Sequence, residues 1–203
     1  MSALDKADGP PPTGLRLSCA DGRTLKVAAA VVAVSVTVLQ RGLISFSPPL
    51  PPPQVRAIGS IRVAPACKLI LRFSAPPWGP AESAGARALT ARPLHSVLCV
   101  GGPVPEVWFT PRRDARGRLS SWAASGFATG DYATSICARP RGAAVDAFVQ
   151  QLATVLAAVL FEEAGETAPP TAAARSEMLA RLRCSLLSSE VMDWSADPWA
   201  AGG

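Results

Sequence analysis

Lys68 is the side chain in this sequence whose type and context best suit it to chemistry. It opens the apolar run Lys68–Phe73 (KLILRF), which predicts a strand bounded by Pro65 and by Pro76–Pro77. Placing an ammonium group among apolar side chains is costly unless the group has a partner or a function. The pattern alone still favours an exposed lysine on an edge strand, because charged residues there discourage pairing with other chains.

The other reactive side chains form no arrangement typical of a catalytic or metal site. His95 is the single histidine, so neither a Ser-His-acid triad nor a histidine-containing zinc site is supported by spacing. Asp131 and the group Glu162, Glu163 and Glu166 do not form a pair suited to two-carboxylate catalysis, and the group indicates a solvated helix end. The sequence contains no GxGxxG, P-loop, HExxH or GxSxG motif.

Cysteine spacing and the length of the apolar runs indicate the cellular environment of the protein. The five cysteines lack CxxC spacing, which favours buried, reduced thiols in an intracellular protein. The polar, Pro-rich N-terminus is unlike a signal peptide, and the most apolar stretch, Val27–Leu39, is shorter than the roughly 20 residues of a membrane span. We therefore expect a soluble protein. The cysteines are Cys19, Cys67, Cys99, Cys137 and Cys184.

Composition indicates a folded chain with a modest positive charge. Apolar residues make up 49% of the 203 residues and charged residues 17%, with a formal net charge of +5. Asp114 and Gly117 interrupt the densest basic run, and a nucleic-acid surface normally needs a clustered basic face, often with aromatic residues. The run is therefore interpreted as a solvated loop, with no direct nucleic-acid motif. It contains Arg112, Arg113, Arg116 and Arg118.

The first third of the chain has three recognisable patterns. An Asp-Gly pair between Leu15–Cys19 and Thr24–Val27 predicts a β-hairpin. The Val-rich run Ala30–Val38 predicts a strand buried on both faces. The Pro-rich run Phe46–Pro53 predicts an extended segment, followed by a short helix over Gln54–Ile61.

The rest of the chain predicts an α+β domain, in which a mixed, mostly antiparallel sheet is covered by one main helix. That helix is Ala143–Ala164, where apolar residues recur at helical spacing and Gly165 follows the end. A second helix is expected within Thr171–Leu187, and the small residues of Gly79–Pro93 predict a loop. The expected strands after Phe73 are Ser96–Val100, Glu106–Thr110 and Leu119–Phe127, of which the last two would form a hairpin.

Four segments in order resemble the flavin-containing amine oxidases, in the branch of polyamine oxidases and lysine-specific histone demethylases. Residues 31–51 resemble a strand followed by "VPLGVLK.G.I.F.PPLP", and Cys67–Phe73 with Trp78 resembles "NKVVLRF..FW". Phe127–Ala133 is similar to "LVAGEAA", and Trp194–Gly202 is similar to "W..DPW..GSYS". The resemblance runs from about Asp21 to the end of the chain.

The resemblance implies FAD as cofactor and assigns roles to particular residues. Lys68 would hold a water against the reactive nitrogen of the flavin. Trp194 and Trp199 would lie near the flavin and the amine pocket, although core packing is an equally good interpretation of Trp194. Ser35–Val36 stands where the family has residues beside the flavin, and Trp78, like Trp199, would contact substrate. The implied reaction is hydride transfer from the carbon beside the amine nitrogen of a small amine or methylated lysine, with O2 reduced to H2O2.

The departures from the family pattern leave a second interpretation open. Ser35-Val36-Thr37 replaces the family's Pro-Leu-Gly, Asp131 replaces the glutamate of "GEAA", and the glycine-rich dinucleotide-binding fold is missing. We expect an incomplete fragment with a disordered Pro-rich N-terminus over 1–14, a substrate-binding domain over 15–190, and the start of a return segment to the FAD-binding domain over 191–203. The alternative is a degenerate, non-catalytic binding or scaffold module.

Overall fold

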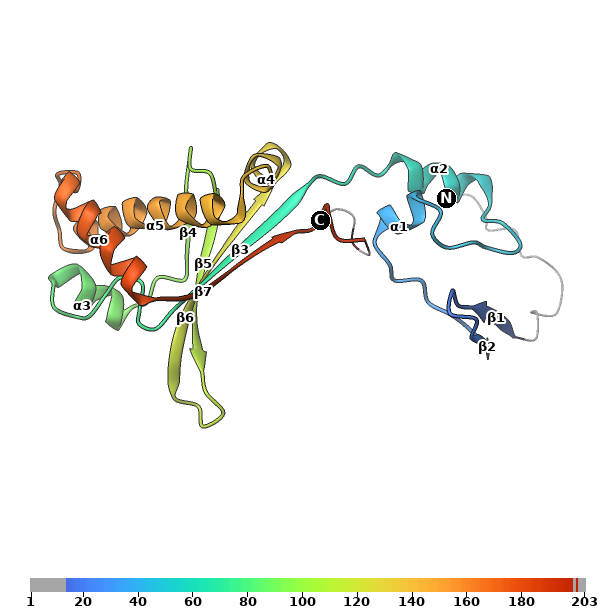
Figure 1. Ribbon diagram of the computed structural model, residues 1–203, viewed down its shortest axis with the longest axis horizontal. Coiled ribbons are helices and arrows are strands. Elements are labelled where there is room, and N and C mark those ends of the chain that lie inside the picture. The colour runs from blue at the N-terminus through green and yellow to red at the C-terminus, as the bar shows by residue number, and fades with distance from the viewer. Residues whose placement is uncertain (1–13, 199, 201–203) are drawn as a thin grey trace, which may run out of the picture. The chain divides into compact units, whose positions relative to one another are not determined.

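The computed structural model describes residues 14–198 and residue 200. The Pro-rich N-terminus predicted over 1–14 therefore lies, apart from Gly14, outside the described residues. The chain divides into two compact units, Met1–Val34 and Ser35–Gly203. Figure 1 shows the helices and strands of both units.

The first unit contains an antiparallel hairpin of β1 (Leu15–Ser18) and β2 (Thr24–Val27). Gly22 occupies the turn with a φ of 84°, a conformation that glycine adopts without strain. The Asp21 carboxylate accepts a hydrogen bond from the backbone N–H of Arg23 at 3.0 Å. The hairpin predicted from the Asp-Gly pair is confirmed.

The doubly buried strand predicted over Ala30–Val38 is wrong. The segment is irregular as far as Ser35, Val31 is 92% exposed, and helix α1 (Val36–Gln40) begins within the predicted range. A strand becomes buried on both faces only when other strands pair with it and covering layers pack on both sides. The described residues of the first unit form only the short hairpin, so the apolar residues of the predicted strand have no larger sheet to join within that unit.

The second unit begins with α1 and with α2 (Pro52–Ser60). The side-chain amide of Gln40 donates a hydrogen bond to the backbone carbonyl of Ile58 at 2.8 Å and so joins the ends of the two helices. The helix predicted over Gln54–Ile61 is confirmed. The extended segment predicted over Phe46–Pro53 is too long by two residues, because α2 already begins at Pro52. Proline suits the first turn of a helix, where a backbone N–H would have no partner within the helix.

A five-stranded antiparallel sheet, with strand order β4-β5-β6-β3-β7, organises the rest of the second unit. All predicted strands after Pro65 are present, and β5 and β6 form the predicted hairpin. The edge strand β7 was not predicted because its exposed, polar-rich sequence lacks an apolar alternation. The strands are β3 (Ala66–Phe73), β4 (Ser96–Leu98), β5 (Glu106–Arg113), β6 (Leu119–Thr129) and β7 (Leu186–Asp193).

Helices pack on one face of this sheet. The two predicted helices are confirmed as α5 and α6, whereas α4 was not predicted. The loop predicted over Gly79–Pro93 is wrong, because it contains α3, whose first turn is capped by the Ser83 hydroxyl accepting a hydrogen bond from the N–H of Ala86 at 3.1 Å. The helices are α3 (Ala84–Ala91), α4 (Gly130–Cys137), α5 (Arg141–Glu163) and α6 (Ala172–Ser185).

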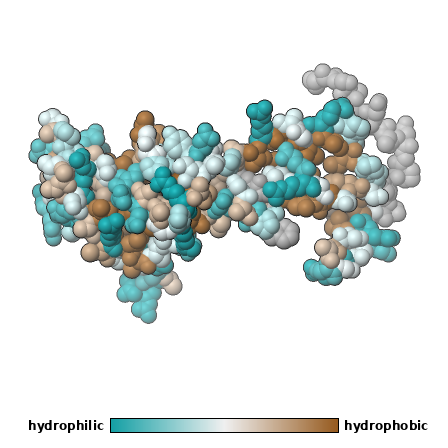
Figure 2. Space-filling model, turned by 45° about the horizontal axis from the view of Figure 1, so that its top comes forward, coloured by the Kyte–Doolittle hydropathy of each residue, from teal (hydrophilic) through white to brown (hydrophobic). Residues whose placement is uncertain are grey.

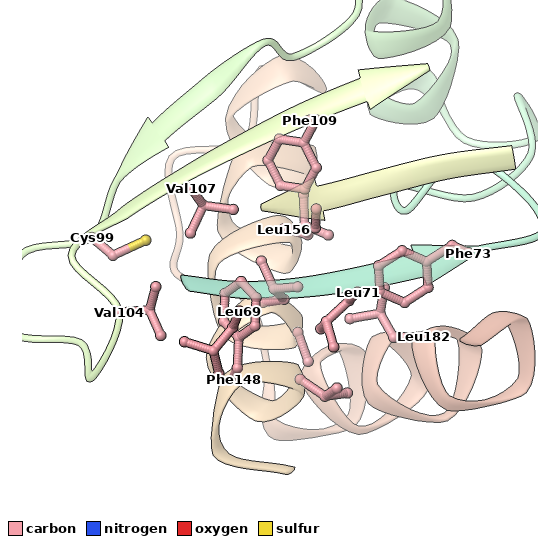
Figure 3. Packing of buried hydrophobic residues seen from close by; sticks show 14 of the residues in the cluster. Leu69, Leu71, Phe73, Cys99, Val104, Val107, Phe109, Phe148, Leu156 and Leu182 are labelled. Carbon is pink, nitrogen blue, oxygen red and sulfur yellow. The ribbon is translucent and has the colours of Figure 1, made fainter. Parts of the chain in front are cut away.

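The hydrophobic core lies between the sheet and α5. Phe148 and Leu156 of α5 and Leu69 and Leu71 of β3 are all 0% exposed, and Figure 3 shows them packed together with Leu182 of α6. Within the described residues, α5 alone is long and apolar enough to cross a membrane, but a core helix of this kind has the same length and composition. The predicted α+β class, with an antiparallel sheet covered by one main helix, is confirmed.

Gly85 allows α3 to approach α5 closely, and we expect Gly85→Ala to destabilise the fold. A Cβ atom at this position would clash with the backbone carbonyl of Leu160. Since a backbone carbonyl in a helix cannot move alone, the two helices would have to separate, at a cost of about 1–3 kcal/mol. Urea unfolding measures the loss, and Gly142→Ala, where an added Cβ meets nothing within 4 Å, is the matched control. Equal effects of the two substitutions would contradict the close approach.

Candidate functional site

The candidate site lies on the face of the sheet opposite the core. Because side chains alternate along a strand, Cys67, Leu69 and Leu71 of β3 enter the core, whereas Lys68 and Ile70 lie on the other face. This second face is only partly covered, and Lys68 and Ile70 are both half-buried. We call it the open face.

Lys68 has defined neighbours on the open face. It pairs across the sheet with Phe127 of β6 on one side and Met192 of β7 on the other. The ring of Phe127 lies 6.5 Å from that of Trp108 on β5, with an angle of 48° between the planes. Trp108 is 36% exposed, so an aromatic surface accessible to solvent adjoins the lysine. Lys68 is thus flanked on the sheet by an aromatic and a thioether residue.

The structure corrects the edge-strand interpretation of Lys68. Strand β3 is an interior strand, because β6 and β7 pair with its two edges. A lysine there cannot protect a sheet edge from pairing. No ion pair with Lys68 is found among the described residues, so a structural salt bridge does not account for it either. This leaves an ammonium group with donors free for water or a ligand.

The turn after β7 lies next to the start of β3. The N–H of Trp194 donates a hydrogen bond to the carbonyl of Ala66 at 3.0 Å, two residues before Lys68. The Asp193 carboxylate then accepts a hydrogen bond from the N–H of Ser195 at 2.8 Å, which shapes the turn. Trp194, which is half-buried, and Lys68 therefore lie at the same end of the sheet.

The segment Ser35-Val36-Thr37 contacts the chain after β7 through one hydrogen bond. The Ser35 hydroxyl donates to the carbonyl of Ala200 at 2.8 Å, so the start of α1 contacts the segment that follows Trp194. The hydroxyl of Thr37 is buried and has no hydrogen-bond partner among the described residues. Trp199, predicted to lie near flavin and substrate, is outside the described residues.

These residues fit one part of a flavin site. A free ammonium group on an open face can form a hydrogen bond to the ring system of a flavin or to water beside it. The described residues contain no glycine-rich strand-turn-helix that would hold the phosphates of a dinucleotide. The fit is therefore to the reactive end of FAD, and Lys68 and Trp194 are the residues that would face it.

Trp78 does not join this group. It is 1% exposed and packs edge-on against Trp122 at 4.7 Å and Phe109 at 6.1 Å, on the core side of the sheet. Its indole N–H is buried without a hydrogen-bond partner among the described residues. The structure therefore separates Trp78 from Lys68 by the thickness of the sheet, and its contact with substrate stays a prediction.

Sequence reasoning missed Met192 as the cross-strand neighbour of Lys68, and Trp108 as the ring beside Phe127. Trp108 lies in the predicted strand Glu106–Thr110, where apolar Val107 and Phe109 point to the core and leave Trp108 on the other face. That alternation could have identified it. Met192 lies in the strand that was not predicted, so no pattern indicated it.

Several thiols lie behind the site, on the core side. All five cysteines are free, of which Cys19 and Cys184 are exposed. Burial raises the pKa of Cys67 and of Cys99 above the ordinary 9.0. Burial, reinforced by a hydrogen bond with Cys67, raises the pKa of Cys137 to about 12. A protonated thiol in apolar surroundings is a poor nucleophile, so these groups serve packing.

We expect the stability of the fold to fall above about pH 9 in part because of Cys137. Its thiol binds a proton more tightly in the folded state, so its stabilising contribution is complete below pH 9.0 and is lost as pH rises toward about 12. Urea unfolding at pH 8 and near pH 10.5 measures the fall. The fall should be smaller in Cys137→Ala and unchanged in Cys184→Ala, and identical pH profiles for all three proteins would contradict the shift.

The family model described as flavin containing amine oxidoreductase matches residues 3–203. No curated protein matches the chain.

Solved structures share the fold at low identity. A triple mutant of putrescine oxidase superposes with a TM-score of 0.62 at 14% identity, and wild-type putrescine oxidase bound to putrescine with 0.60 at 14%. Cyclohexylamine oxidase from Brevibacterium oxydans IH-35A gives 0.58 at 18%. Each match covers 94% of this chain, which spans only 34% of the other chain. With the family match over nearly every residue, the chain belongs to the flavin containing amine oxidoreductases.

Proposed function

We propose that this chain is the substrate-facing part of a FAD-dependent amine oxidase of the polyamine oxidase and histone demethylase branch. The observation that carries the proposal is the position of Lys68 on an interior strand beside an aromatic pair. This lysine is half-buried, and it forms no ion pair among the described residues. In this proposal residues 15–190 form the substrate-binding domain. Residues 191–203 begin the return to the FAD-binding domain.

The open face supplies binding and orientation for an amine. Trp108 and Phe127 present a tilted aromatic pair at 6.5 Å, and the faces of such rings attract cationic and alkylated amines. Met192 adds a polarisable, adaptable surface on the other side of Lys68. The ammonium group of Lys68 repels the charged end of a protonated amine, so the substrate is directed toward the aromatic pair and away from the lysine.

Lys68 acts on water in this proposal. Bound FAD supplies the two-electron oxidation of the carbon beside the amine nitrogen, with O2 as the final acceptor. The three N–H donors of Lys68 can hold a water and turn its lone pair toward the oxidised substrate, which then breaks down to an aldehyde and a free amine.

A flavin absorbance spectrum tests the proposal. The purified chain is incubated with FAD, free cofactor is removed, and putrescine, cyclohexylamine and a methylated lysine peptide are added in turn. A retained flavin band that bleaches on addition of an amine supports an oxidase, and the amine that bleaches it defines the substrate class. A folded but colourless protein would contradict catalysis by this chain alone and would favour the non-catalytic binding or scaffold module.

A further inference from the structure

The hairpin between β5 and β6 extends beyond the rest of the sheet. Strand β3 pairs with β6 only as far as Phe73 opposite Trp122, whereas β5 and β6 stay paired as far as Arg113 opposite Leu119. The last part of the hairpin is therefore a free two-stranded ribbon, visible in Figure 1 as the loop that projects past the other strands. Its residues contribute nothing to the core, since every residue from Thr110 to Ser120 except Asp114 is exposed.

Four arginines lie on this ribbon, and we call residues 112–118 the arginine tip. Its single acidic residue, Asp114, is occupied within the tip, because its carboxylate accepts hydrogen bonds from the backbone N–H of Arg116 at 2.8 Å and of Arg118 at 2.9 Å. The Arg118 side chain forms an ion pair with the same carboxylate at 3.0 Å. The turn is thereby fixed in shape, and its surplus of positive charge is turned outward. Figure 2 shows a hydrophilic projection below the sheet at this place.

The remaining guanidinium groups of the tip are uncommitted to acidic partners. Among the described residues, Arg112, Arg113 and Arg116 form no ion pair, and the Arg113 guanidinium donates only to the carbonyl of Gly117, at 2.9 Å. Such groups on a preformed turn can bind an anion without losing an internal salt bridge.

Arg72 continues the positive charge from the tip onto the sheet. Its Nε donates to the hydroxyl of Ser121 at 3.3 Å, and Ser121 pairs across the ladder with Arg112. Ser121 is only 2% exposed, and it lies between these two arginines. Positive charge therefore runs continuously from the open face to the end of the ribbon.

In place of the solvated-loop interpretation of Arg112, Arg113, Arg116 and Arg118, and because they lie together on a free two-stranded ribbon, we propose that the arginine tip binds the phosphate backbone of duplex DNA, with the ribbon entering the major groove. Guanidinium groups bind phosphate oxygens in a two-pronged geometry that lysine does not provide. A major groove about 12 Å wide admits a two-stranded β-ribbon, whereas the major groove of an RNA duplex is too narrow for side chains to read. The contacts lie on phosphates, so the binding is independent of sequence. It is also independent of flavin and of amine oxidation.

Fluorescence anisotropy with the whole chain and a labelled duplex of about 20 base pairs tests this proposal. The probe variant is Arg112→Ser/Arg113→Ser/Arg116→Ser, and its matched control is Arg56→Ser/Arg139→Ser/Arg175→Ser, which removes the same charge from exposed arginines without side-chain bonds among the described residues. Each phosphate contact contributes about 0.9 to the slope of log affinity against log salt, so three contacts give about a 40-fold weakening between about 50 and 200 mM salt. The slope for the probe variant should lack the contribution of these three contacts, and the slope for the control variant should retain it.

Three outcomes would overturn the proposal. They are the absence of duplex binding at low salt, an equal loss in probe and control variants, and binding of an acidic peptide such as polyglutamate as tight as that of the duplex. Circular dichroism of both variants checks the fold, which the substitutions should leave intact because all six residues are exposed. A colourless, flavin-free preparation serves equally well, so failure of the oxidase proposal and failure of this one are separate results.

Discussion

Lys68→Met is expected to slow catalysis about a hundredfold or more in the flavin-loaded protein, without removing the flavin. The substitution keeps an unbranched side chain of similar length in an interior strand but removes the N–H donors that would orient water. General acid-base groups typically contribute 10²–10⁴-fold, so an effect of about two orders of magnitude is expected. Stopped-flow absorbance separates bleaching of the flavin by an amine from its recovery in air, and the recovery or the release of aldehyde should carry the loss.

The control for this experiment is Lys26→Met, which makes the same chemical change on the exposed strand β2. We expect its rates to match those of the unaltered protein. If Lys68→Met also keeps full rates of bleaching and recovery, the function assigned to Lys68 is wrong even where the protein oxidises amines. If it loses the flavin band, the lysine serves cofactor binding instead.

Phe148→Ala is expected to lower the free energy of unfolding by about 3–5 kcal/mol. Phe148 is 0% exposed at the centre of α5, and it packs against β3 and against the sheet position of Gly126, where an added Cβ would lie 2.8 Å from its ring. Removing the ring leaves a cavity between helix and sheet that neither element can close without moving. A loss of this size is comparable to the whole stability of a small domain, so we expect partial unfolding at 37 °C.

Urea unfolding followed by circular dichroism measures this loss, with Phe161→Ala as the matched control on the same helix. Phe161 is only half-buried near the end of α5, so its removal opens less of a cavity and should cost clearly less. Comparable losses for the two substitutions would contradict the central position of Phe148 in the core. The comparison also shows whether α5 is a core helix, since a membrane-spanning helix would not respond to urea in this way.

The elements with strong local patterns could be predicted from the amino-acid sequence. The Asp-Gly hairpin, the KLILRF strand, the long apolar helix and the antiparallel α+β class all follow from turn chemistry and from periods of two or 3.6 residues. The family, too, could be recognised from the order of short motifs around Lys68 and Trp194. These features depend on residues close together in the chain, which is why a sequence displays them.

The positions of the less patterned segments, and the side chains that meet, depend on packing and could not be predicted from the sequence. Strand β7 forms because β3 offers it an edge, and α3 forms because Gly85 lets it pack against α5; neither carries a strong period of its own. The interior position of β3 ruled out the edge-strand interpretation of Lys68, and the alternation of the sheet placed Trp78 in the core. Such outcomes depend on pairing between distant segments, and the free energy that selects them appears only when those segments are packed.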